Sequence, residues 1–163
     1  MSLSTPRWWY VRTGAPAPIT RMLLRPLSWL WAYVTERRIR NAKPGDAGIP
    51  VICVGNLTMG GAGKTPVVRE LLLRLTHAKK RAHGLSRGHG GTLEGPIQVD
   101  PDNHDASEVG DEPLMLAQDF PMWVARNRLA GAKAAAAAGA QVVVMDDGHQ
   151  NPDVKKALSI IVV

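Results

Sequence analysis

The chain has 163 residues, of which 45% are apolar, a composition that fits one globular domain or part of a larger protein. Its single cysteine, Cys53, excludes an internal disulfide and favours a reducing compartment. Residues 1–45 carry eight Lys and Arg against one acidic residue, whereas the remainder carries 12 basic and 13 acidic residues. The net charge of +6 therefore belongs to the N-terminal segment, which argues against a nucleic-acid-binding surface on the main domain.

Residues 1–49 predict a helical segment and linker ahead of the main domain. Four of the five tryptophans and both tyrosines lie there. The apolar run 22–34 is shorter than the roughly 20 residues that span a bilayer, and a basic cluster follows it at 36–40. Aromatic and basic residues in this order favour a helix lying at a membrane surface. The alternative is a helix whose tryptophans are buried against its own domain.

Residues 50–65 read PVICVGNLTMGGAGKT and predict a buried strand, a glycine-rich loop and the start of a helix that continues over 66–75. This is the layout of a phosphate-binding loop, although Thr58 stands where the usual spacing has glycine. In such a loop, backbone N–H groups and a lysine (here Lys64) bind the phosphates, and the hydroxyl of the next residue, Thr65, can bind Mg²⁺. The alternative is a glycine-rich turn that happens to precede Lys-Thr.

The middle of the chain predicts short strands at 82–86 and 97–99. Arg87 follows the first of them, at the sheet edge where ligands bind, and is either a phosphate contact or a surface arginine. Residues 100–110 predict a solvated polar loop without a metal site.

Gly110-Asp111-Glu112-Pro113 then opens an apolar helix over 114–120. Two acidic residues in a first turn stabilise a helix through its dipole, and this is the alternative to a catalytic role for Asp111 or Glu112. A strand at 123–125 and an alanine-rich helix at 127–138 follow.

Residues 141–147, QVVVMDD, predict a second buried strand that delivers Asp146 to the carboxyl edge of the sheet. An aspartate there holds Mg²⁺ in phosphate-loop nucleotide sites, and the alternative is a strand ended by an Asp-Asp-Gly turn. Residues 158–163 predict another buried strand, and a buried strand is costly to end on a bare carboxylate. We therefore expect the N-terminal part of a longer protein. The predicted fold is α/β, a mostly parallel sheet of the P-loop NTPase type flanked by helices, over residues 50–163.

The ordered set VICVGNLTMGGAGKTP, LSRGHGG, VGDEP, WVARNR and VVVMDDGHQNP resembles the tetraacyldisaccharide 4′-kinase (lipid A 4′-kinase) family of Gram-negative bacteria. The resemblance implies an ATP- and Mg²⁺-dependent transferase that phosphorylates the 4′-hydroxyl of a tetraacylated glucosamine disaccharide 1-phosphate in lipid A biosynthesis. It also implies that the enzyme acts at the cytoplasmic face of the inner membrane, where the N-terminal segment would contact the membrane surface. Family members are about twice this length, and their second half supplies a histidine that pairs with the catalytic aspartate.

The resemblance assigns roles to particular residues of this chain. Asp111 is the acid that helps to deprotonate the sugar hydroxyl, with Lys64 as the catalytic lysine. The Mg²⁺ partners are Thr65, Glu112 and Asp146, with Asp147 behind them. The ATP-binding residues are Thr58, Met59, Gly60, Gly61, Ala62, Gly63, Lys64, Thr65 and Arg87. This chain has His89 and His149 where the family usually has other residues.

Two other classes of function fit the same sequence. One is a membrane-associated nucleotide-binding module or ATPase switch without lipid kinase activity. The other is an anionic-lipid anchor whose working part is the basic N-terminal arm. The sequence contains no visible Asn-Lys-x-Asp motif, which GTPase switches use to recognise guanine.

Overall fold

The computed structural model describes residues 18–56, 63–148 and 151–162 of the chain. These residues form two compact units, one within residues 1–42 and one over residues 43–163.

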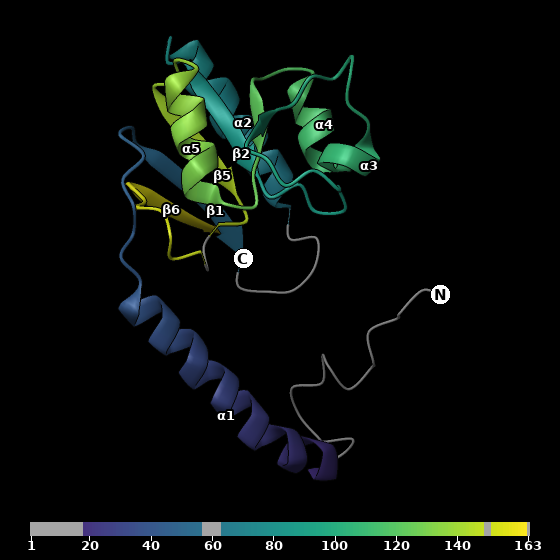
Figure 1. Cartoon of the computed structure of the whole chain (residues 1–163), viewed down its shortest axis with the longest axis vertical. Helices are drawn as coiled ribbons and strands as arrows, with labels where there is room; N and C mark the ends of the chain where they lie inside the picture. Colours follow the sequence, from purple (N-terminus) through teal and green to yellow (C-terminus); the bar gives the residue numbers. More distant parts are fainter. Residues whose placement is uncertain (1–17, 57–62, 149–150, 163) are drawn as a thin grey trace. The chain divides into compact units, whose positions relative to one another are not determined.

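The described part of the first unit is one helix, α1 (Pro18–Asn41), drawn in purple and blue in Figure 1. It carries exposed large apolar side chains on more than one side: Leu27, Trp29, Leu30, Trp31, Tyr33 and Val34. Trp29 and Trp31 are 74% and 76% exposed, so these tryptophans are not buried in the unit that contains them. In the described ranges, no helix is long and apolar enough to cross a membrane.

The second unit is built on a six-stranded sheet in the order β3-β4-β2-β5-β1-β6. The strands are β1 (Val51–Asn56), β2 (Ala82–Ser86), β3 (Ile97–Gln98), β4 (Met122–Val124), β5 (Val142–Asp146) and β6 (Leu158–Val162). The helices are α2 (Lys64–His77), α3 (Ala106–Val109), α4 (Asp111–Ala117) and α5 (Arg128–Ala137). All strand pairs are parallel except β3 with β4, which confirms the predicted mostly parallel α/β sheet.

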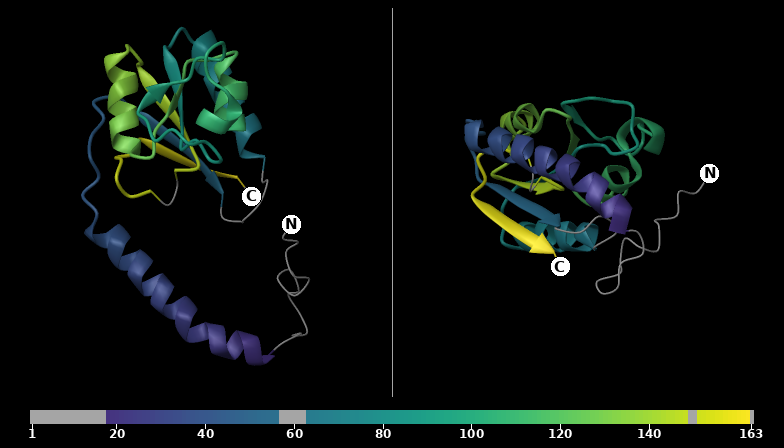
Figure 2. Two further views of the ribbon diagram at one scale, coloured as in Figure 1. Left: turned by 45° about the vertical axis from the view of Figure 1, so that its right-hand side comes forward. Right: turned by 90° about the horizontal axis from the view of Figure 1, so that it is seen from below.

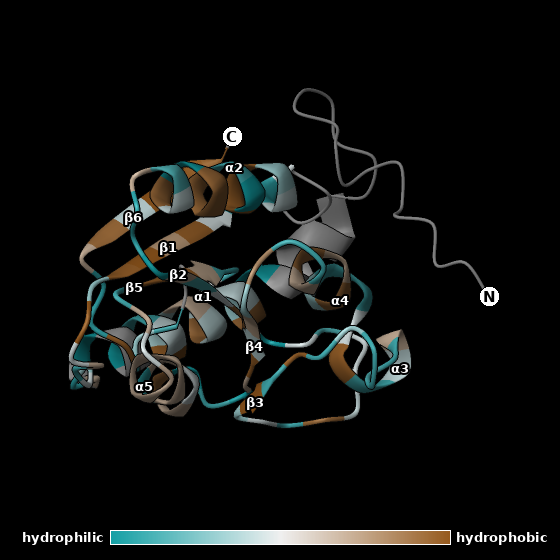
Figure 3. Ribbon diagram, turned by 90° about the horizontal axis from the view of Figure 1, so that it is seen from above, coloured by the Kyte–Doolittle hydropathy of each residue, from teal (hydrophilic) through white to brown (hydrophobic). Residues whose placement is uncertain are grey.

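The sheet lies between α2 on one face and α5 on the other (Figures 2 and 3). On the α2 face, Val68 and Leu72 pack with Val54 and Val144 from the neighbouring strands β1 and β5. Each of these side chains is fully buried and contributes about 2 kcal/mol of hydrophobic free energy. On the α5 face, small buried alanines let the helix approach the sheet closely. This is the packing reason for the alanine-rich sequence.

Two predictions about local structure are wrong. The segment predicted as a polar loop over 100–110 contains α3, because Asp105 and Glu108 form a reciprocal capping box at its start. The next helix, α4, begins at Asp111 with both acids in its first turn, as predicted. The strand over 158–162 is not buried: β6 pairs only with β1 at the sheet edge, and Leu158 and Ile161 are exposed.

Candidate active site

The carboxyl ends of β1 and β5 meet the first turn of α2. The parallel register pairs Val54 with Asp146, so the ends of these two neighbouring strands lie side by side. Gly63, at the N-cap of α2, has φ +68°, a left-handed conformation that glycine adopts without strain. Among the described residues, no side chain caps this helix end. The first N–H groups of α2 and its positive dipole make this end a place where an anion can bind.

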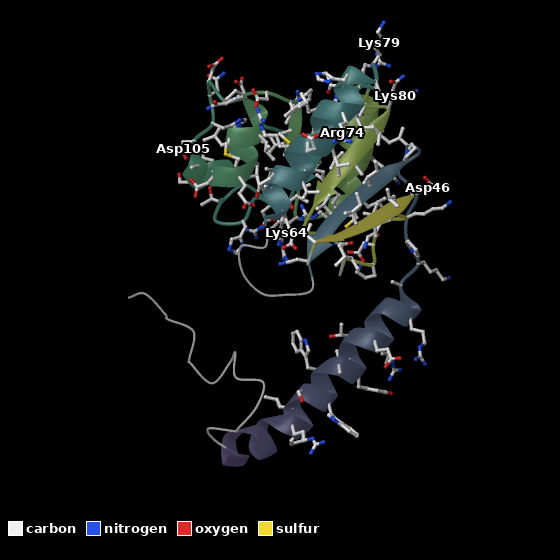
Figure 4. All side chains as sticks on the ribbon, turned by 180° about the vertical axis from the view of Figure 1, so that it is seen from behind. Asp46, Lys64, Arg74, Lys79, Lys80 and Asp105 are labelled. Atoms are coloured by element: carbon white, nitrogen blue, oxygen red, sulfur yellow. The ribbon has the colours of Figure 1, made fainter. Side chains whose placement is uncertain are left out.

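Lys64, the first residue of α2, reaches across to both strand ends, and Figure 4 shows its side chain at this edge of the sheet. Its Nζ lies 3.1 Å from Asn56 Oδ1 and 3.1 Å from Asp147 Oδ1. Asn56 ends β1 and Asp147 directly follows β5. The ammonium is thus held between the two strands at the place where the sequence predicts phosphates to bind.

Thr65, Glu112 and Asp146 are brought to the same place from three different elements. Thr65 Oγ1 donates a hydrogen bond to Glu112 Oε1 over 3.1 Å, which connects the first turn of α2 to the first turn of α4. The negative charge of Glu112 also acts on Asp146 at the end of β5. Of the three residues predicted to bind Mg²⁺, Thr65 and Glu112 are thus in direct contact, and Asp146 is close enough to Glu112 for its charge to act.

Asp146 is the most constrained acid of the site. It is 4% exposed, and its Oδ1 is buried without a hydrogen-bond partner among the described residues. Burial, reinforced by the charges of Glu112 and Asp147, raises the pKa of Asp146 from 3.8 to about 6, and the charges of Lys64 and Arg128 oppose this rise. A buried carboxylate oxygen without a donor is what a cation would satisfy.

This donor set fits Mg²⁺. Magnesium is held in proteins by one or two carboxylates together with waters and substrate phosphates. In the described part of the chain, no group of three or more His, Cys, Asp or Glu residues is arranged to hold a metal by itself. Asp146, Glu112 and the Thr65 hydroxyl offer the smaller set of hard oxygen ligands that Mg²⁺ needs beside a nucleotide.

Arg128 is a residue of the site that sequence reasoning missed. It is only 3% exposed, and its guanidinium donates hydrogen bonds to Ala125 O (3.3 Å) and Asp146 O (3.2 Å). Burial lowers the pKa of Arg128 to about 10, and the charge of Asp146 partly offsets that effect. The motif WVARNR contains this arginine, but arginines are mostly exposed and nothing in the pattern indicates burial.

Arg87 lies at the same edge of the sheet. It is exposed, directly follows β2, and its charge acts on Arg128. The loop after it packs backbone to backbone on the segment before α4, with Thr92 N–H and Leu93 N–H donating to Ser107 O (3.0 Å) and Glu108 O (2.9 Å). These contacts fix the LSRGHGG loop against the VGDEP segment.

Gly110 is a tight point of that contact. It has φ +92°, and a Cβ on it would stand 2.7 Å from His89 O. Only glycine fits there without a shift of the backbone. Asp111 and Glu112 follow immediately as the first residues of α4, so this contact sets where both acids lie. The side chain of Asp111 is exposed.

The remaining predicted residues of the nucleotide loop are outside the described residues: Thr58, Met59, Gly60, Gly61 and Ala62. His149 is also outside them. Acids of the predicted polar loop make local contacts. Asp100 accepts from Asn103, and Asp105 caps α3.

Because the pKa of Asp146 is raised, we expect a neutral side chain at this position to increase the free energy of unfolding. Between about pH 4 and pH 6, Asp146 is still protonated in the folded chain but already ionised in the unfolded chain. The free energy of unfolding therefore falls as pH rises through this range. We expect Asp146→Asn to raise that free energy by about 3 kcal/mol at pH 7.5 without divalent metal, and by little at pH 4. Urea denaturation at both pH values measures it.

Asp102→Asn is the control, because Asp102 is exposed in a turn. Asp46, Asp100 and Asp105 have lowered pKa values, with the opposite pH dependence, and they cancel when a variant is compared with the parent chain. An Asp146→Asn difference that does not change with pH would contradict the burial of a charged carboxylate.

Comparison with known proteins places this geometry in a family. The family described as "LpxK: Tetraacyldisaccharide-1-P 4′-kinase" matches residues 20–163. A tetraacyldisaccharide 4′-kinase of Caulobacter vibrioides (strain NA1000 / CB15N) is 71% identical over 100% of this chain and 49% of its own length. One from Rhodospirillum centenum is 55% identical over 99% of this chain and 48% of its own length. The chain spans about half the length of the curated relatives it matches.

A solved structure agrees with these matches. The crystal structure of the "apo" form of LpxK from Aquifex aeolicus in complex with ATP superposes with a TM-score of 0.76 at 29% identity. The match covers 88% of this chain and 49% of that one.

Proposed function

Because the chain belongs to the tetraacyldisaccharide-1-phosphate 4′-kinase family, we propose that it is the nucleotide-binding part of a lipid kinase. The enzyme would transfer the γ-phosphoryl group of ATP to the 4′-hydroxyl of a tetraacylated glucosamine disaccharide 1-phosphate. The observation that carries the proposal is the position of Lys64 between the ends of β1 and β5, with Asp146, Asp147 and Glu112 around it. A P-loop kinase needs that set of one cation and several acids.

The proposed roles follow from the chemistry of each group. The predicted phosphate loop and the start of α2 bind the β- and γ-phosphates, and Lys64 balances their charge. Arg87, exposed at the same edge, binds phosphate or substrate. Asp111 accepts the proton of the 4′-hydroxyl as its oxygen forms a bond to the γ-phosphorus. The bond from that phosphorus to the β,γ-bridging oxygen breaks, and ADP leaves.

Mg²⁺, when bound, would offset the charge that develops on the leaving phosphate. Thr65, Glu112 and Asp146 are the residues that would hold it. Arg128 keeps the carboxyl end of β5 in place through Asp146 O.

We also propose that α1 binds the surface of the bacterial inner membrane on its cytoplasmic side. An acylated substrate has its chains in a bilayer, so the enzyme must work at that interface. Exposed Trp29 and Trp31, together with Leu27, Leu30 and Val34, give α1 the apolar surface that an interfacial helix buries among headgroups. Arg37 and Arg40 near its end are exposed and suit anionic lipid.

We expect the double substitution Trp29→Ser/Trp31→Ser to weaken binding to phosphatidylglycerol-containing vesicles at least about tenfold. Each lost tryptophan side chain removes more than about 1 kcal/mol of favourable burial at the interface. Flotation of the chain with vesicles measures this effect. Ser28→Ala, on the same exposed stretch of α1, is the control. Equal flotation of the parent and double-variant chains would remove the aromatic side chains from the membrane contact.

The function itself is tested by incubation with γ-labelled ATP, Mg²⁺ and the disaccharide lipid. Two proteins are compared: the 163-residue chain, and the same chain joined to the second half of the Caulobacter relative. We expect label in the lipid with the joined protein, and ATP binding without transfer by the shorter chain. Binding without transfer by both would favour a nucleotide-binding module that is not a kinase. Binding by neither would contradict the proposal.

A further inference from the structure

Asn56 is the last residue of β1 and one of the two acceptors that hold Lys64. The contact is partly buried, and the lysine side chain is 20% exposed. An ammonium can only donate hydrogen bonds, so the amide oxygen of Asn56, and not its NH₂ group, must face Nζ. Chemistry therefore fixes the orientation of this side chain at the mouth of the candidate phosphate site.

The second acceptor, Asp147, differs from Asn56 in charge and in exposure. Its side chain is 67% exposed, and an ion pair so open to water contributes less than about 1 kcal/mol. A lysine side chain gives up roughly 2 kcal/mol of rotamer entropy when it is fixed in one geometry. The partly buried amide at the end of a central strand is the better-fixed of the two anchors.

The neutrality of Asn56 matters because a triphosphate is an anion. The Lys64–Asp147 pair carries no net charge, and a phosphate that replaces Asp147 meets the positive charge of the ammonium, which the neutral Asn56 leaves in place. A carboxylate at position 56 would leave a net negative charge at the same place. An amide is the acceptor that fixes the ammonium without neutralising it.

Resting on the proposed ATP-binding function, we propose that Asn56 is a positioning residue for Lys64. It holds the ammonium at the ends of β1 and β5 while leaving its charge available to the β- and γ-phosphates. Asp147 is then the exchangeable partner, which a phosphate oxygen replaces.

The test compares Asn56→Asp, Asn56→Ala and the parent chain by calorimetric titration with ATP and with ADP, each with Mg²⁺. We expect Asn56→Asp to lower the affinity for ATP at least about tenfold. Asn56→Ala should lower it by less, because only the first substitution adds a negative charge. The loss should be larger for ATP than for ADP, since the lysine reaches the γ-phosphate only in ATP. Gln118→Glu adds the same charge at the exposed end of α4 and should change neither affinity.

A second measurement needs no nucleotide. The rate of amine labelling of Lys64, followed by mass spectrometry against the exposed Lys133 of the same molecule, should rise in Asn56→Ala because one anchor is gone. Unfolding midpoints of the variants check that each is folded. An unchanged labelling rate of Lys64, or equal losses of affinity for ATP and for ADP, would overturn the positioning role. A parent chain that binds no ATP would overturn the proposed function as well, whereas tight ATP binding by Asn56→Asp would overturn this inference alone.

Discussion

Replacing Lys64 by alanine is expected to lower ATP affinity about a hundredfold and to abolish phosphoryl transfer in the joined protein. The ammonium lies 3.1 Å from Asn56 and from Asp147 at the edge where β1 and β5 end. Charge-assisted hydrogen bonds contribute about 1.5–3 kcal/mol each, and a loss near 2.7 kcal/mol is a factor of about 100 in affinity. Calorimetry and the labelled-ATP assay measure the two effects.

The same substitution should leave stability almost unchanged. The pair that Lys64 forms with Asp147 is exposed on the Asp147 side, and such pairs contribute less than about 1 kcal/mol. Lys133→Ala, which removes an exposed lysine from α5, is the matched control for net charge. If Lys64→Ala bound ATP as tightly as the control, the ammonium would have no part in nucleotide binding.

The central part of the fold was predictable because its sequence pattern is local. The run Val51–Val54 and the run at 142–145 are continuous and apolar, as strands buried on both faces must be. The spacing of Val68 and Leu72 places both on the face of α2 that packs on the sheet. Since parallel strands end at a common edge, the approach of Lys64 to the end of β5 followed from these elements, although the acid that it contacts is Asp147 and the predicted one was Asp146.

What the sequence did not reveal depends on contacts between distant segments. Asn56 and Arg128 have partners that are 8 and 18 residues away, and neither residue type indicates burial by itself. The helix α3 depends on one capping box in a very polar segment. The run at 158–162 is apolar enough for a central strand, yet β6 pairs on one side only, and periodicity does not distinguish the two positions.

Asp111→Asn is expected to lower the rate of phosphoryl transfer by about 10²–10⁴ while leaving ATP affinity within about twofold of the parent, because general-base catalysis contributes rate enhancement of that size. Asp111 opens α4 with an exposed side chain, next to Glu112, which accepts from Thr65. It is therefore beside the candidate Mg²⁺ ligands and accessible to a hydroxyl. An amide of the same shape cannot take up the proton.

Two comparisons separate proton transfer from other roles of this acid. Glu112→Gln should weaken the dependence of transfer on Mg²⁺, since the hydrogen bond from Thr65 holds its carboxylate beside Thr65 at the proposed metal site. Asp119→Asn, just after α4 and paired with Arg69, removes a charge away from the site and should change neither rate nor affinity. A loss of ATP affinity in Asp111→Asn as large as the loss of rate would assign Asp111 to nucleotide binding, because a base for the sugar hydroxyl contacts the acceptor and not the nucleotide.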